Sequence, residues 1–101
     1  MITYLIEAYV ANAELTDVPA RVEATAAAMS EEGHAIRYVR SLLLHADETC
    51  FHLVEATSKA SVAELARRAH LGHERIVEAE ESSSSGTGNQ AQPRPTEGEQ
   101  I

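Results

Sequence analysis

The chain has 101 residues, of which 44% are hydrophobic and only 4% aromatic, and its formal net charge is −8. This length and composition predict one domain with an aliphatic core. Lys and Arg form no cluster, which argues against binding to nucleic acid. The single cysteine excludes an internal disulfide and a four-cysteine zinc site. The N-terminal run MITYLIEAYV is broken by Glu7 and is too short to span a membrane, so a cytoplasmic protein without a membrane partner is expected.

The first half of the chain predicts a strand, a helix and a second strand. Ile2–Tyr9 is rich in β-forming residues and predicts the first strand. A helix follows, because Pro19 suits a first turn and Gly33 suits a C-terminal cap. Its apolar stripe has helical spacing and consists of Val18, Val22, Ala26 and Met29. Ile36–Leu44 then predicts the second strand.

The second half begins with a hairpin and continues into a second helix. Cys50–Ala56 predicts the third strand, after a polar turn at residues 46–49. Either Ser58 or Ser61 is expected to cap the second helix, and Ser61 and Glu64 have the spacing of a capping box. The apolar stripe of this helix consists of Val62, Leu65, Ala66 and Ala69.

The order of the elements indicates the fold. Gly72 ends the second helix, and Arg75–Ala79 predicts a short fourth strand. The resulting β-α-β-β-α-β order favours an α+β, ferredoxin-like fold, in which two helices cover one face of a four-stranded antiparallel sheet. Residues 1–80 form this domain. Residues 81–101 are rich in Ser, Gly, Pro and Gln and predict a disordered tail.

Strand alternation assigns the polar residues to the two faces of this sheet. If small aliphatic residues lie under the helices, then Glu7, Glu55 and Glu78 point to the helix-free face. Pairing across the hairpin sets Arg40 opposite Glu55 and adds Tyr38 to the same face. The predicted ligand-binding residues on this face are Glu7, Tyr9, Tyr38, Arg40, Glu55 and Glu78.

The helix-free face is also apolar, which predicts a homodimer. Its expected apolar members are Leu5, Phe51, Leu53 and Ile76. A face of this kind is not stable in water, and a second copy is the simplest cover for it. Three partly desolvated acids opposed by one Arg favour a metal or small-molecule pocket, whereas the alternative is a set of ion-paired interface residues.

The histidines predict a metal site at one end of the sheet. His52 is expected on the helix-facing side as a hydrogen-bonded, half-buried residue. In this fold the hairpin turn, the end of the first strand and the start of the fourth strand meet, which brings His70 and His73 to the same end as His45. Together with Glu7, they predict a mixed imidazole and carboxylate site that suits Ni, Zn or Co.

Three stretches also carry a family resemblance: YLIEAYV, IRYVRSLLLHADETCFHLVEATS and HLGHERIVEA. They resemble a family of small bacterial, mainly actinobacterial, ferredoxin-like proteins of unknown function that includes a dimeric nickel-binding member. The likeness covers Tyr4 to Ala79, and it implies the same fold and nickel as the bound metal. The family commonly has Arg in place of Ala8 and Pro in place of His45, so its individual nickel ligands are not carried over.

Motifs typical of catalysis are missing from the sequence. It has no G-x-S-x-G, no Walker lysine loop and no dinucleotide fingerprint, and Ser41 has no evident base. The sequence therefore favours a non-enzymatic, nickel-binding homodimer. The alternative is a dimeric α/β-barrel-type protein or enzyme, in which open-face Glu, Tyr and Arg bind a small molecule and Glu7 or Glu55 accepts a proton. A third interpretation is a dimeric interaction module whose acids set its partner.

Overall fold

The computed structural model describes residues 1–82, except for the side chains of His73 and Glu74. The predicted β-α-β-β-α-β order is confirmed, and two short 3-10 helices are added to it. The elements are β1 (Ile2–Tyr9), η1 (Asn12–Glu14), α1 (Val18–Glu31), β2 (Ile36–Leu44), η2 (His45–Asp47), β3 (Thr49–Ala56), α2 (Lys59–Arg68) and β4 (His73–Glu78). The tail predicted from residue 81 lies outside the described residues, apart from its first two positions.

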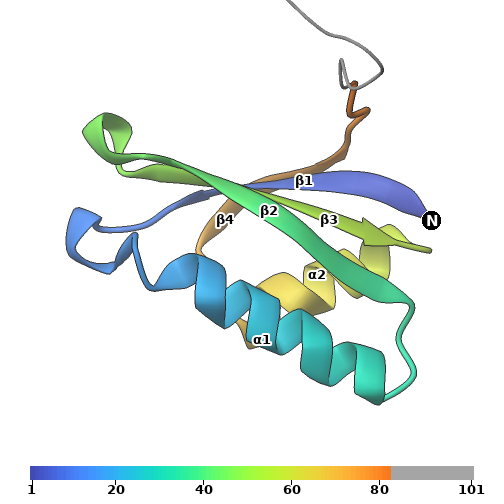
Figure 1. Cartoon of the computed structure of the whole chain (residues 1–101). Helices are drawn as coiled ribbons and strands as arrows, with labels where there is room; N and C mark the ends of the chain where they lie inside the picture. Colours follow the sequence, from blue (N-terminus) through green and yellow to red (C-terminus); the bar gives the residue numbers. More distant parts are fainter. Residues whose placement is uncertain (83–101) are drawn as a thin grey trace, which may run out of the picture.

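The four strands form one antiparallel sheet with the order β2-β3-β1-β4. Both helices lie on the same side of this sheet, and its other face is open (Figure 1). This arrangement confirms the predicted ferredoxin-like α+β fold. None of the described helices has the length and apolar character needed to cross a membrane.

The core lies between the sheet and the helices, and both predicted helical stripes are buried in it. The stripe residues are Val18, Val22, Ala26 and Met29 of α1, and Val62, Leu65, Ala66 and Ala69 at α2. The two central strands contribute their helix-facing residues, which are Tyr4, Ile6, Ala8, Cys50, His52, Val54 and Ala56. Burial of each larger apolar side chain contributes about 1.5–3 kcal/mol to the free energy of folding. This burial stabilises the packing of the helices on the sheet.

Gly33 ends α1 with the geometry that its sequence position predicts. Its backbone φ is +106°, a value that residues with a Cβ rarely adopt. The amide of Gly33 donates to the carbonyl of Ser30 at 3.0 Å, and the amide of His34 donates to the carbonyl of Met29, also at 3.0 Å. These two bonds form a Schellman motif, which satisfies carbonyls that the helix end leaves free.

Ser58, and not Ser61, caps α2. The Ser58 hydroxyl oxygen accepts a hydrogen bond from the amide of Ser61 at 3.3 Å. The capping box predicted from Ser61 and Glu64 does not form. It cannot form because α2 begins at Lys59, which places Ser61 inside the first turn and not at the N-cap. The Glu64 carboxylate is bonded instead to two guanidinium groups further along α2.

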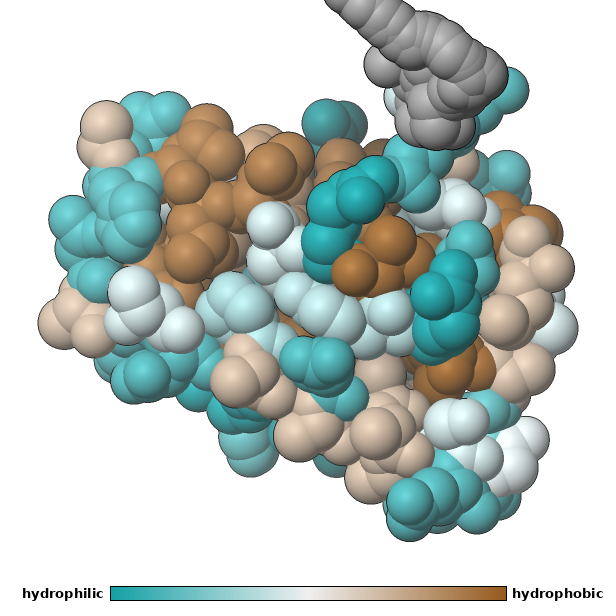
Figure 2. Space-filling view, in the orientation of Figure 1, coloured by the Kyte–Doolittle hydropathy of each residue, from teal (hydrophilic) through white to brown (hydrophobic). Residues whose placement is uncertain are grey.

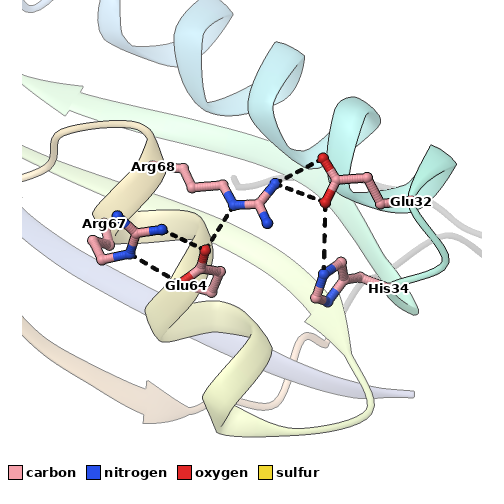
Figure 3. Close-up of polar contacts among 5 residues, drawn as sticks. All are labelled: Glu32, His34, Glu64, Arg67 and Arg68. Atoms are coloured by element: carbon pink, nitrogen blue, oxygen red, sulfur yellow. Dashed lines mark hydrogen bonds and ion pairs between the residues drawn. The ribbon is translucent and has the colours of Figure 1, made fainter.

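A network of ion pairs joins the C-terminal parts of the two helices (Figure 3). Glu64 accepts hydrogen bonds from Arg67 at 2.6 Å and from Arg68 at 2.7 Å, and these bonds lower the pKa of Glu64 to about 2. Arg68 also donates to both oxygens of Glu32 at 2.9 Å, and the ring of His34 lies 3.9 Å from the same carboxylate. The network therefore connects α2 to the end of α1.

Candidate functional site

The open face of the sheet presents a large apolar surface. Figure 2 shows apolar surface along the side of the molecule where the sheet lies in Figure 1. On β2, Leu42 and Leu44 are 57% and 38% exposed, and on β1 Tyr9 is 54% exposed. Leu5 and Leu53, which are half-buried, lie directly opposite each other in the centre of this face. The predicted apolar character of the helix-free face is thus confirmed.

The prediction for β2 is partly wrong, because a register shift interrupts its pairing with β3 between Tyr38 and Arg40. Residues opposite each other in antiparallel strands point to the same face. Tyr38 lies opposite the buried Val54, so it belongs to the helix side and not to the open face. Arg40 keeps the predicted face, but it lies opposite Leu53 and forms an ion pair with Glu81.

The prediction for β4 is also wrong in its choice of face. Glu78 pairs with Tyr4, which points toward the helices, so Glu78 is an exposed residue on the helix side. Ile76 is 7% exposed and belongs to the core, whereas Val77 lies opposite Leu5 on the open face. The larger aliphatic side chain fills the core here, contrary to the assumption that small residues lie under the helices.

Both strand carboxylates of the open face have arginine partners. Glu55 accepts hydrogen bonds from Arg37 at 2.8 and 3.1 Å, and Arg37 occupies the position opposite it that the sequence assigned to Arg40. Glu7 accepts a hydrogen bond from Arg75 at 2.8 Å. The sequence predicted three acids and one Arg on this face, and that prediction is wrong. The strands place two acids there, Glu7 and Glu55, together with Arg37, Arg40 and Arg75.

Two loops meet at the end of β1, as the fold predicts. On one side the amide of Val10 donates to the carbonyl of Glu48, which follows η2, at 3.0 Å. On the other side the amide of Tyr9 donates to the carbonyl of Gly72, in the loop before β4, at 3.4 Å. The loops that carry the predicted histidine ligands thus share one end of the sheet.

The predicted metal ligands lie at this end but on either side of β1. His45 is exposed on the β3 side, where its Nδ1 lies 3.1 Å from Asn12 Oδ1. His70 is exposed on the β4 side, and His73 begins β4 opposite the end of β1. Glu7 points to the open face, where Arg75 holds it. Within the described residues, no group of three or more His, Cys, Asp or Glu side chains is placed to hold a metal ion.

A partly buried chain of hydrogen bonds on the helix side was not predicted from the sequence. The hydroxyl groups of Tyr38 and Ser41 are 2.7 Å apart, and Ser41 Oγ lies 2.6 Å from Nδ1 of His52. His52 is hydrogen-bonded as predicted, although it is fully buried and not half-buried. Burial, with a smaller contribution from the positive charge of Arg21, lowers the pKa of His52 to about 4. The correct pairing of Ser41 with His52 would have revealed this contact.

This contact does not make Ser41 a nucleophile. Nε2 of His52 is buried without a hydrogen-bond partner. A buried N–H without an acceptor destabilises the fold more than a buried ring nitrogen that accepts no hydrogen bond. The ring proton of His52 therefore belongs on Nδ1, which has a partner. In that tautomer Nδ1 donates to Ser41 Oγ, and the imidazole cannot accept the proton of the Ser41 hydroxyl.

A shallow pocket of about 210 Å³ lies nearby, between α1 and the start of β2. Its lining residues are Glu23, Ala26, Ala27, Ser30, Ile36, Arg37 and Tyr38. Of the predicted ligand-binding residues it contains only Tyr38. The pocket therefore lies on the helix side and is distinct from the open face on which a ligand site was predicted.

Comparison with known proteins identifies the family of the chain. No curated protein and no solved structure is detectably similar to the chain. The family model described as "Nickel responsive protein SCO4226-like" matches residues 4–79, which cover all six main elements except the first two residues of β1. The chain therefore belongs to the SCO4226-like family of nickel responsive proteins.

Proposed function

We propose that the protein is a non-enzymatic homodimer that binds Ni²⁺. The observation that carries this proposal is membership of the nickel responsive family over residues 4–79. The chemistry of the exposed side chains at the end of the sheet supports it. Imidazole nitrogens and carboxylate oxygens are donors that suit Ni²⁺, and no thiolate is required.

The open face supports the dimeric part of the proposal. Its apolar centre includes Leu5, Leu42 and Leu53, and exposed apolar surface of this kind marks an interaction site. Its charges are balanced by the Glu7–Arg75 and Glu55–Arg37 pairs, although the whole chain carries a net charge of −8. Net charge of one sign makes two such chains repel each other, and the paired charges of this face add little to that repulsion.

The proposed metal ligands are His45, His70, His73 and Glu7. Because the described side chains of a single chain do not form a three-ligand group, we place the site where two chains meet, with each chain supplying part of the ligand set. Glu7 would have to release Arg75 to join it, since its Oε1 accepts the guanidinium hydrogen bond. The exposed imidazoles of His45 and His70 need no such exchange with an ion-pair partner.

Calorimetric titration of the tag-free protein with Ni²⁺ tests the proposal. Saturable binding with affinity tighter than millimolar is expected, and alanine in place of His45 or His70 should weaken it by tenfold or more because each removes a ligand. His34→Gln is the matched control, since His34 lies at the opposite end of the sheet. The proposal fails if the wild type shows no saturable binding. It also fails if the His45 and His70 variants both bind Ni²⁺ as tightly as the wild type and the His34→Gln control.

The nickel affinity should also depend on pH. A metal binds the neutral imidazole, so protons compete with the ion at the ligating histidines. The affinity is therefore expected to fall as the pH is lowered.

A second candidate function is small-molecule binding, which is favoured by the pocket between α1 and β2. Its lining includes the polar side chains of Glu23, Arg37 and Tyr38. A thermal-shift screen separates the two functions. If an organic metabolite raises the melting temperature and no tested metal ion does, small-molecule binding is supported over nickel binding.

A further inference from the structure

After β4 the chain turns back over the open face of the sheet. The amide of Ala79 donates to the carbonyl of Thr3 at 2.9 Å, so Ala79 still continues the line of β4 beside β1. A straight continuation would place Glu81 beside Met1. Glu81 instead forms an ion pair with Arg40 of β2, the strand at the opposite edge of the sheet. In Figure 1 the chain after β4 rises on the side of the sheet that carries no helix.

The width of the sheet shows what this ion pair spans. One row of residues crosses the open face from β2 to β4, and it consists of Arg40, Leu53, Leu5 and Val77. Three strand spacings separate the ends of this row by about 14 Å. The two residues from Ala79 to Glu81 span only about 7 Å even when extended. The side chains of Arg40 and Glu81 must therefore extend toward each other above the central strands β1 and β3.

The pair thus lies over the apolar centre of the face that the proposed dimer uses. Leu5 and Leu53 form this centre and are half-buried. The side chains of Arg40 and Glu81 are 57% and 32% exposed, so both charged groups still contact water. A second chain that docks on the centre must either bury this pair, which requires desolvation of two charges, or displace it.

We propose that residues 79–81, held by the Arg40–Glu81 pair, compete with the second chain for the open face and so regulate dimer formation. The inference rests on the proposed homodimer and adds a closed form of the single chain, in which the pair is intact. Formation of the dimer requires both chains to leave the closed form. An exposed ion pair shifts such an equilibrium by no more than about fivefold, so the closed form weakens the dimer without preventing it.

The first test is the position of the segment in the dilute protein. In a ¹H–¹⁵N NMR spectrum, Glu81→Gln should shift the side-chain Nε–H signal of Arg40. Glu80→Gln is the matched control, because it removes the same charge from the neighbouring exposed residue and should leave that signal in place.

The second test is the dissociation constant of the dimer, measured for the full chain by sedimentation equilibrium at low salt. Glu81→Gln should lower it by about threefold to twentyfold relative to Glu80→Gln, because the loss of the pair acts once in each of the two chains. In an Arg40→Gln background, Glu81→Gln should have no further effect. High salt screens an exposed pair, so the difference between the two Glu variants should shrink there.

The possible failures can be told apart. If the wild type and all variants stay monomeric at every concentration, the proposed homodimer is overturned, and its regulation falls as well. If a dimer forms but the Arg40 signal does not respond to Glu81→Gln, the inference alone is overturned. It is also overturned if Glu81→Gln weakens the dimer or matches Glu80→Gln, since the segment then supports the interface or has no influence on it.

Discussion

At the residue scale, His52 shows how the core holds a polar side chain in one protonation state. The ring is fully buried, its Nδ1 is bonded to Ser41, and its Nε2 has no partner. Arg21 reaches the same region from α1, where its Nε donates to the carbonyl of Ala69 at 2.7 Å. Protonation of the ring would place a second positive charge in a dry site next to this guanidinium. Burial and then Arg21 therefore favour the neutral imidazole.

This buried imidazole predicts loss of stability in acid. The pKa of His52 is about 4 in the folded chain and about 6.5 when unfolded, so the unfolded state binds the proton first as the pH decreases. Stability linked to His52 is complete above pH 6.5 and decreases between about pH 6.5 and 4, by about 3 kcal/mol in total.

Urea unfolding at several pH values measures this linkage. The variant His52→Asn should lose the part of the pH dependence that falls in this window, whereas His34→Gln, on the surface, should retain it. An equally steep pH dependence in wild type and His52→Asn would show that His52 is not the group responsible.

At the element scale, Gly33 has a different role from the other described glycine, Gly72. An added Cβ at Gly33 would meet no atom within 4 Å, so any cost of substitution there comes from the positive φ of +106° alone. Gly72 has no positive φ, and a Cβ there would lie 4.0 Å from the carbonyl oxygen of Tyr9, an ordinary contact.

Replacement of each glycine by Ala should separate these cases. Gly33→Ala is expected to destabilise the protein by about 1–2 kcal/mol, because an L-residue is forced into left-handed backbone at the Schellman motif. Gly72→Ala should change the free energy of unfolding by less than about 1 kcal/mol. Thermal and urea unfolding measure both, and equal losses of stability would refute the conformational explanation.

The elements themselves could be predicted because their signals are local. The stripe of α1 and the role of Gly33 follow from spacing along the chain alone. The faces of Tyr38 and Glu78 could not be predicted in the same way. They depend on the register shift within β2 and on how β4 aligns with β1, and strand pairing sets both through contacts far apart in sequence.

The candidate site was predicted less completely for the same reason. The sequence placed His45 and His70 at one end of the sheet, because connectivity alone brings their loops to the end of β1. It missed Arg37 and Arg75 as partners of the open-face acids, since each pair requires the correct register. The contact between Asn12 and His45 was missed because Asn12 lies in η1, a short helix that no sequence signal marks.

At the scale of the whole molecule, the chain has one face covered by helices and one that is open. Leu42 tests the role of the open face with little damage to the fold, because 57% of its surface is exposed in the single chain. Leu42→Glu should place a charge in the dimer interface and raise the dissociation constant at least tenfold. Ala63→Glu, on the exposed surface of α2, is the matched control. Light scattering after size-exclusion chromatography measures both, and a dimer unaffected by Leu42→Glu would mean that a different surface mediates association.

Native mass spectrometry of the tag-free protein, with and without added Ni²⁺, tests nickel binding and dimer formation together. The expected result is a dimer that retains nickel in a fixed ratio to the two chains. A monomer at every concentration, or a dimer that retains no nickel at saturating Ni²⁺, would contradict a nickel-binding homodimer.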